Sequence, residues 1–134
     1  MSGIDIMTMG NHTWAKREIF QIFKRSYIWT AIFGGGICFG GHEPLLQQKF
    51  IAEFIRYTRK QDTKWKFGLE TSLNAKIDDK LLNLLDYLIV DIKDINSNIY
   101  KKYTEIDNGL VLENLKFIQT FSKKTFSDSI CLYW

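Results

Sequence analysis

The stretch Gly34–Gln48, "GGGICFGGHEPLLQQ", decides how this chain folds. Glycines stand on both sides of the apolar triplet Ile37–Phe39, and Pro44, the only proline of the chain, follows soon after. Together with the preceding "AIF", the triplet predicts a strand over 31–39. Pro44 suits the first turn of a helix, because the N–H that proline lacks is one that a helix start leaves unpaired. The stretch therefore predicts a strand, a turn of bare backbone and a helix start.

Downstream of Pro44 the apolar pattern predicts two further strand–helix units. A helix is expected over 45–60, a strand over 65–73 and a short amphipathic helix over 76–86. A near-continuous apolar run predicts a buried strand over 86–94. The segment 96–108 is expected to be a loop that can contain a helical turn. A last helix is expected over 109–121, and its core candidates are Leu110, Leu112, Leu115 and Ile118. This alternation predicts an α/β fold of parallel strands with right-handed crossovers.

Length and composition exclude several functional classes. The chain has 134 residues, of which 46% are hydrophobic and 25% charged, as is usual for one globular domain. A net charge of +3 does not favour a nucleic-acid partner. No apolar run reaches the roughly 18 residues of a membrane span, and no signal-peptide pattern opens the chain, so a cytoplasmic location is expected. Cys38 and Cys131 are too few and too far apart for a disulfide framework or a recognisable metal site.

Polar and glycine residues follow each of the three predicted strands. Because the carboxyl ends of parallel strands meet at one edge, we expect these groups to lie together and to bind a ligand. Glycines let a ligand approach the backbone closely, and residues that alternate along a strand end share a face. The candidate site residues are Gly40, Gly41, His42 and Glu43 after the first strand, Glu70 and Thr71 after the second, and Asp91 and Lys93 after the third.

The chemistry of these residues fits a small zwitterion. Asp91 and Lys93 could bind its opposite ends, while Glu70 and Thr71 offer oxygen atoms to a hard cation or an ammonium group. Taken singly, each cluster has a simpler interpretation as a tight turn, a surface ion pair or a helix cap. Their alignment at one edge of one sheet favours the binding site.

Three ordered motifs resemble one family. "GGGICFGGHEPLLQ" is similar to the Gly-Gly-x-Thr-Phe-x-Gly-Gly-Glu-Pro-Leu-Leu signature of radical S-adenosylmethionine (SAM) enzymes, and in particular to glycyl-radical-enzyme activases of the pyruvate formate-lyase activating enzyme type. "LETSLN" and "YLIVDIKDINSNIYKKYTEIDNGLVLENLKFI" resemble the next segments of that family, so the likeness runs from Gly34 to Ile118. It implies a partial (β/α) barrel of radical SAM type with parallel strands, incomplete at both ends.

The resemblance also implies roles for the candidate site. In the family the Gly-Gly-Glu-Pro segment contacts the SAM amino group. The acid-Thr and Asp-x-Lys pairs lie near the methionine carboxylate, with a monovalent cation nearby in some activases. Residue by residue, the amino-group contacts pass to Gly40, Gly41 and Glu43, with His42 between them, and the carboxylate end passes to Glu70, Thr71, Asp91 and Lys93.

The family reaction is the reductive cleavage of SAM by a [4Fe-4S] cluster. The resulting 5′-deoxyadenosyl radical takes a hydrogen from a glycine of the partner, a glycyl radical enzyme. This chain departs from the family at Cys38, which replaces a threonine, and at His42, which replaces a glycine. If position 42 needs a positive φ, the Cβ of histidine costs about 1 kcal/mol. The cluster motif Cys-x-x-x-Cys-x-x-Cys is missing, because no cysteine precedes Cys38.

Whether the chain is an enzyme is left open by these departures. We expect a truncated relative that does not catalyse the family reaction alone. The alternatives are a non-catalytic SAM-binding or interaction module and a non-functional gene remnant. Open sheet edges would favour self-association.

The two ends look different from the middle. We expect 1–26 to be a segment of unrelated appearance, 27–122 to be the partial radical SAM domain and 123–134 to be a tail without an interpretable pattern. Residues 2–20 weakly resemble the calcineurin-like metallophosphoesterases through Gly10-Asn11-His12. That resemblance implies metal binding by Asn11 and phosphate chemistry by His12. The other ligands of a two-metal site are absent from the sequence, so phosphoesterase activity is not expected.

Overall fold

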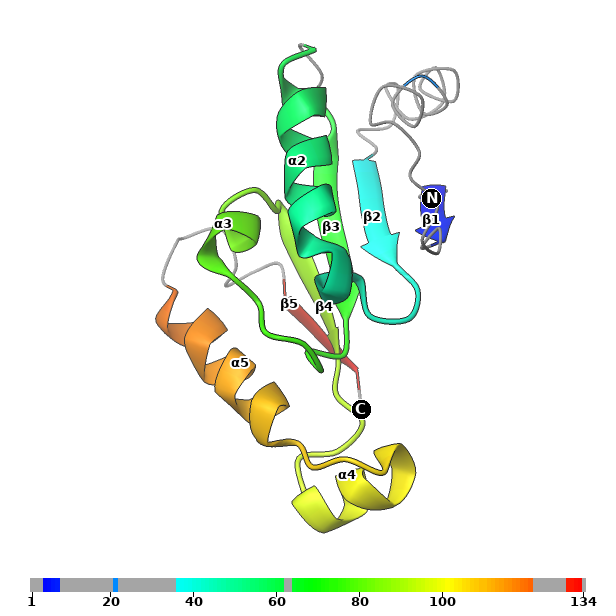
Figure 1. Cartoon of the computed structure of the whole chain (residues 1–134), viewed down its shortest axis with the longest axis vertical. Helices are drawn as coiled ribbons and strands as arrows, with labels where there is room; N and C mark the ends of the chain where they lie inside the picture. The colour runs from blue at the N-terminus through cyan, green and yellow to red at the C-terminus, as the bar shows by residue number, and fades with distance from the viewer. Residues whose placement is uncertain (1–3, 8–20, 22–35, 62–63, 122–129, 134) are drawn as a thin grey trace.

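The structure is a computed structural model that describes residues 4–7, 21, 36–61, 64–121 and 130–133. Its centre is a five-stranded parallel sheet in the order β1-β2-β3-β4-β5 (Figure 1). The strands are β1 (Ile4–Met7), β2 (Gly36–Gly40), β3 (Lys66–Thr71), β4 (Tyr87–Asp91) and β5 (Ile130–Tyr133). The predicted α/β class with parallel strands is confirmed.

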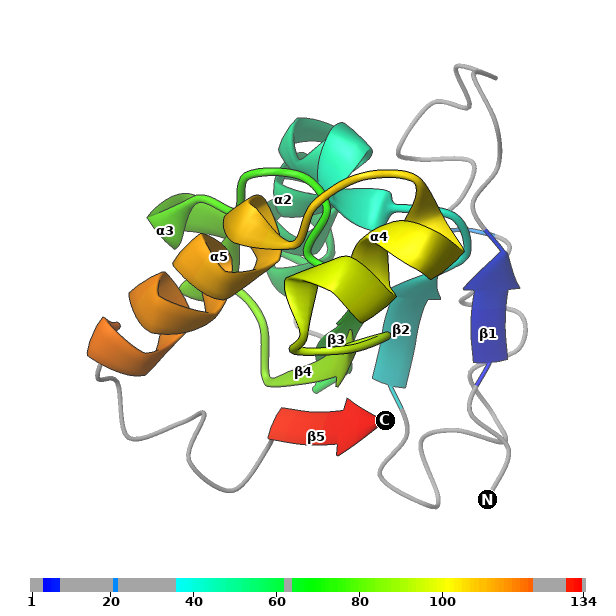
Figure 2. The ribbon, with the colours of Figure 1, turned by 90° about the horizontal axis from the view of Figure 1, so that it is seen from below.

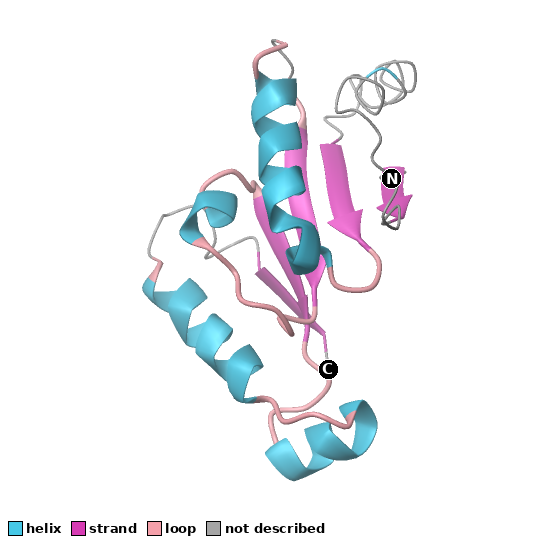
Figure 3. Cartoon of the chain, viewed as in Figure 1, coloured by secondary structure: helices cyan, strands magenta, loops and turns pink. Residues whose placement is uncertain are grey.

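The described helices cover one face of this sheet. They are the 3₁₀ turn η1 (Pro44–Gln47), α2 (Gln48–Arg59), α3 (Asp79–Leu82), α4 (Ser97–Thr104) and α5 (Gly109–Thr120). Figure 2 shows them together on one side of the strands, and Figure 3 separates the same elements by type. Within the described part of the chain, no helix covers the opposite face, which we call the open face.

Alternation along the strands explains the core. Successive side chains of a strand point to opposite faces, so every second residue meets the helices. Phe39 of β2 packs edge-to-face on Phe54 of α2, with the ring centroids 6.0 Å apart. The apolar strand residues buried on the helix side are Ile37, Phe39, Phe67, Leu69, Leu88 and Val90. The alternate strand positions, among them Gly40, Glu70 and Asp91, lie on the open face.

The prediction of a loop over 96–108 is wrong for its first half, which forms α4. The Asn96 side chain accepts hydrogen bonds from the backbone N–H groups of Asn98 and Ile99 and so caps the helix start. Glu105, with a φ of 66°, ends the helix in the left-handed conformation. These short polar signals, which surround only eight residues, carry the helix.

The predicted core face of α5 is also partly wrong. Leu110 is 37% exposed, whereas its neighbour Val111 is buried together with Ile118. Asn114 lies on the same buried face, at helical spacing from both. The leucines misled the prediction because a buried asparagine interrupts the apolar stripe that actually meets the sheet.

The two chain ends contribute edge strands. β1, within the segment 1–26, pairs with β2, and β5, within the tail 123–134, pairs with β4. The division of the chain at residues 26 and 122 stays a prediction. The Gly10–His12 segment lies outside the described residues. None of the helices in the described ranges is both long and apolar enough to cross a membrane.

The close contact of β2 with β3 generates a stability prediction at Gly36. A Cβ atom there would lie 2.1 Å from the backbone oxygen of Lys66, its register partner. The backbone of a paired strand cannot shift away from the added methyl group. We therefore expect Gly36→Ala to lower the free energy of unfolding by about 1–3 kcal/mol. Urea unfolding followed by circular dichroism measures this. The matched control is Gly40→Ala, whose Cβ would meet the side chain of Glu70 alone, with the flexible Oε2 atom nearest at 3.3 Å. Equal unfolding midpoints for the two variants would contradict the packing.

Candidate functional site

Three neighbouring strands bring the predicted site residues to one edge of the sheet. Gly40 is the last residue of β2, Thr71 ends β3 and Asp91 ends β4, with Lys93 two residues further on. In Figure 1 the arrowheads of β2, β3 and β4 point the same way, toward the end of the sheet beyond which α4 lies. The structure therefore brings the candidate residues to one edge of the sheet.

The sheet separates Glu70 from Thr71. Glu70 is exposed on the open face, and its Oε2 atom lies 3.3 Å from the point where a Cβ of Gly40 would stand. Thr71 is only 2% exposed and points toward the helices. Among the described residues, no hydrogen bond or ion pair engages the Glu70 carboxylate. Glu70 and Gly40 thus lie side by side on the open face, whereas Thr71 points away from it.

The Glu43 carboxylate joins the loop after β2 to the loop after β3. Its Oε1 atom accepts hydrogen bonds from the Thr71 hydroxyl at 2.6 Å and from the Leu45 N–H at 3.1 Å. Its Oε2 atom accepts from the Ser72 hydroxyl at 2.8 Å and from the Asn74 N–H at 3.3 Å. Bonds to an ionised acceptor are stronger than neutral ones. The geometry makes Glu43 a residue that holds the edge in shape.

Leu73 shows how tightly the loop after β3 is held. It is fully buried and has a φ of 60°, a conformation that costs a leucine about 1–2 kcal/mol. Its N–H donates to the Thr71 hydroxyl oxygen at 2.9 Å, and its carbonyl accepts from the Asn114 amide at 2.9 Å. Asn114 also donates to the Ala75 carbonyl at 2.9 Å. Sequence reasoning missed Asn114, since nothing local links it to a loop 41 residues away.

The backbone at Gly41 and His42 differs from the strained case considered for the sequence. Gly41 has a φ of 106°, which suits glycine. His42 is exposed, and the non-glycine residues with positive φ in the described ranges are Leu73 and Glu105. The conformational cost considered for His42 therefore does not arise. The bare backbone of the turn is supplied by Gly40 and Gly41.

The Asp91 and Lys93 side chains share a face, as their spacing predicted. The Lys93 ammonium donates a hydrogen bond to the Asp91 carboxylate, and the two side chains are 37% and 50% exposed, Asp91 being the less exposed. An exposed pair of this kind contributes under about 1 kcal/mol. The ion pair therefore contributes little to stability and leaves half of the Lys93 side chain exposed.

A [4Fe-4S] cluster does not fit the thiols of this chain. Such a cluster is held by several cysteine thiolates, and the sequence contains two cysteines. Cys38 lies in β2 and Cys131 in β5, with two strands between them, a separation of about 14 Å at ordinary strand spacing. The described residues also contain no group of three or more His, Cys, Asp or Glu that could hold a metal ion.

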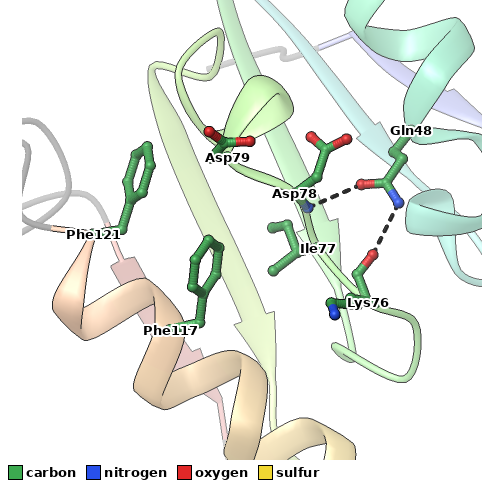
Figure 4. Close-up of a pocket in the computed structure, with 7 residues that line it drawn as sticks. All are labelled: Gln48, Lys76, Ile77, Asp78, Asp79, Phe117 and Phe121. Carbon is green, nitrogen blue, oxygen red and sulfur yellow. Dashed lines mark hydrogen bonds between the residues drawn. The ribbon is translucent and has the colours of Figure 1, made fainter.

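A separate pocket of about 560 Å³ lies on the helix side of the sheet (Figure 4). Gln48 ties its wall together, donating to the Lys76 carbonyl at 2.9 Å and accepting from the Asp78 N–H at 3.2 Å. The other lining residues are Ile77, Asp79, Phe117 and Phe121. None of the predicted site residues lines this pocket, so the open face and the strand ends remain the candidate site.

Comparisons with known proteins place the chain beside activating enzymes. The chain is 30% identical over 99 residues to the 4-hydroxyphenylacetate decarboxylase activating enzyme of Clostridioides difficile, covering 73% of this chain and 31% of that protein. It is 36% identical over 88 residues to the (2S)-3-sulfopropanediol dehydratase activating enzyme of Klebsiella oxytoca, covering 61% and 26%. The chain thus spans about a third or less of these relatives. No protein-family model matches the chain.

A solved structure agrees with the sequence relatives. A domain of the pyruvate-formate lyase-activating enzyme from Bacteroides vulgatus ATCC 8482 superposes with a TM-score of 0.55 and 25% identity, covering 64% of this chain and 53% of that one. The resemblance seen in the three motifs, and the partial radical SAM type of fold, are confirmed by these comparisons.

Glu43 generates the second stability prediction. Glu43→Gln keeps the size of the side chain but replaces one accepting oxygen by an NH₂ group. Either the Leu45 and Thr71 donors or the Ser72 and Asn74 donors then lose their acceptor. We expect the free energy of unfolding to fall by about 1–3 kcal/mol in a urea titration. Glu113→Gln, an exposed position on α5, is the matched control and should change it by less than about 0.5 kcal/mol. If both variants behave alike, the Glu43 carboxylate does not hold the two loops.

Proposed function

We propose that this chain, a homologue of part of the radical SAM activating enzymes of glycyl radical enzymes, binds SAM at the carboxyl edge of its sheet. The observation that carries the proposal is the convergence of three features on adjacent strands. The backbone is bare at Gly40 and Gly41, the Glu70 carboxylate is unengaged among the described residues, and Lys93 is an exposed cation. They match the ammonium and carboxylate groups at the amino-acid end of SAM.

The residues divide into ligand contacts and supports. We assign the SAM ammonium to the Glu70 carboxylate, beside backbone groups of Gly40 and Gly41 that no Cβ screens. Lys93 pairs with the SAM carboxylate, and Asp91 orients Lys93. The resemblance assigns Glu43 and Thr71 to the ligand. In this proposal they do not contact it; their mutual hydrogen bond holds the loops in shape. His42 is exposed beside the turn and is given no contact.

The reaction of the whole family is a broader proposal than SAM binding. The family cleaves SAM reductively with an electron from a [4Fe-4S] cluster and forms a glycyl radical on a partner enzyme. The thiols of this chain do not fit the cluster, so we assign no step of that chemistry to its residues. We propose that the chain contributes the SAM-binding part of such an activating enzyme, with a glycyl radical enzyme as the class of partner.

Titration calorimetry on the full chain tests the proposed site. SAM should bind, and Glu70→Gln should weaken binding by about ten-fold or more, because a hydrogen bond between charged groups is lost. The probe 5′-methylthioadenosine lacks the amino-acid end of SAM. Its affinity should be lower than that of SAM and unaffected by Glu70→Gln.

Glu113→Gln serves again as the matched control, since it removes the same charge from an exposed helix position away from the edge. Binding of SAM that is equally strong in Glu70→Gln and Glu113→Gln would refute the assigned ammonium contact. An absence of SAM binding by the unaltered chain would refute the proposed function itself.

Anaerobic reconstitution with iron and sulfide tests the statement about the cluster. Because two distant cysteines do not supply a cluster site, we expect the isolated chain to retain far less than four irons and to lack a stable charge-transfer absorption. Iron analysis and visible spectroscopy after desalting measure this. A stoichiometric, redox-active cluster on the isolated chain would contradict the assignment.

A further inference from the structure

A directed chain of hydrogen bonds runs from α4 to the loop after β2. The Tyr100 hydroxyl donates to the Asn74 Oδ1 atom at 2.7 Å, and the Asn74 Nδ2 group donates to the Ser72 hydroxyl oxygen at 3.0 Å. The Ser72 hydroxyl then donates to the Glu43 Oε2 atom at 2.8 Å. Every donor in this series points toward Glu43, where an anionic acceptor ends it. Hydrogen bonds aligned in this way polarise and strengthen one another.

Both ends of this hydrogen-bond series are held in place. The Tyr100 ring is 1% exposed, within the core cluster. Asn74 meets the Glu43 carboxylate a second time, through its own N–H at 3.3 Å. Movement of Asn74 therefore changes two contacts of the same carboxylate, which in turn accepts from the Leu45 N–H at the start of η1.

The third strand end is tied into the same arrangement. α4 follows Asp91 and Lys93 after a short connection, and Asn108 holds that connection by donating to the Ile95 carbonyl at 2.8 Å. Through Tyr100, the segment after β4 is therefore joined by hydrogen bonds to the loops after β3 and β2. One buried hydroxyl connects all three strand ends that carry the candidate site.

We propose that Tyr100 and Asn74 are positioning residues that hold the Gly40–Glu43 turn in the geometry that receives a ligand at this edge. Neither residue touches the ligand in this proposal; each acts through Ser72 and Glu43. The effect on SAM rests on the proposed function, but the effect on the turn does not. The two can therefore be separated by experiment.

Tyr100→Phe removes only the hydroxyl and keeps the ring in the core. Its matched control is Tyr103→Phe, the same change on the same helix at a side chain that is 74% exposed. Amide hydrogen exchange in the ligand-free chain is the first readout. The Leu45, Leu73 and Asn74 amides, which donate to side-chain oxygens of Glu43 or Thr71, should exchange about three- to ten-fold faster in Tyr100→Phe than in Tyr103→Phe.

The sheet amides of Leu69 and Leu88 separate this local effect from general destabilisation. We expect their exchange to change less than that of the loop amides. If all five amides speed up by the same factor, or if Tyr100→Phe matches Tyr103→Phe, the positioning role is refuted and Tyr100 is a core residue only. Asn74→Ala removes the middle member of the hydrogen-bond series. Adding Tyr100→Phe to it should therefore not speed up exchange of the loop amides any further.

Calorimetry with SAM is the second readout. Tyr100→Phe should weaken the binding of SAM by about three- to ten-fold, while Tyr103→Phe should leave the affinity for SAM unchanged. If the unaltered protein binds SAM and Tyr100→Phe binds it equally well, the hydrogen-bond series does not influence the ligand and this part of the proposal is refuted. If the unaltered chain binds no SAM, the proposed function fails, and the exchange rates alone decide whether Tyr100 positions the turn.

Discussion

The Glu43 carboxylate is the constraint on which the candidate site depends. Parallel strands bring their carboxyl ends to one edge, but nothing in a parallel sheet makes the loops that leave those ends contact one another. Glu43 supplies that connection by accepting hydrogen bonds from Leu45, Thr71, Ser72 and Asn74. Loss of this acceptor would leave several donors without partners. The resulting loss of stability is larger than the contribution of one exposed ion pair. The turn at Gly40 and Gly41 is thus shaped by a side chain that points away from the open face.

The fold was largely predictable because its central elements carry strong local patterns. The apolar runs at β2, β3 and β4, and the proline before α2, each indicate their element without help from distant residues. α4 was missed because its helix depends on an asparagine cap, with a single buried residue, Tyr100, to show periodicity. β5 was missed because a four-residue edge strand is stabilised mainly by its pairing with β4, which no local pattern records. Tertiary context thus decided the elements that sequence reasoning could not.

The site was predictable in position but not in division of labour. Strand ends of a parallel sheet had to meet, so Gly40, Glu70 and Asp91 could be grouped from the sequence. The period-two alternation of "FGLET" already places Glu70 and Thr71 on opposite faces, a signal that the grouping by resemblance overlooked. Tyr100 and Asn114 could not be found in this way, because their partners lie 26 and 41 residues away in the sequence. Only the folded chain shows that these polar side chains serve the loops.

Leu73 carries a consequence for how the chain acquires its structure. A buried leucine with a φ of 60° is unfavourable until the Thr71 hydroxyl and the Asn114 amide are both in place. Asn114 belongs to α5, so the turn cannot be stabilised before a segment of about 40 residues has closed upon itself and that helix has docked. Contacts between residues far apart in sequence form slowly, and an all-parallel sheet consists of such contacts. The loop after β3, at the edge of the candidate site, therefore reaches its final geometry only after α5 has packed.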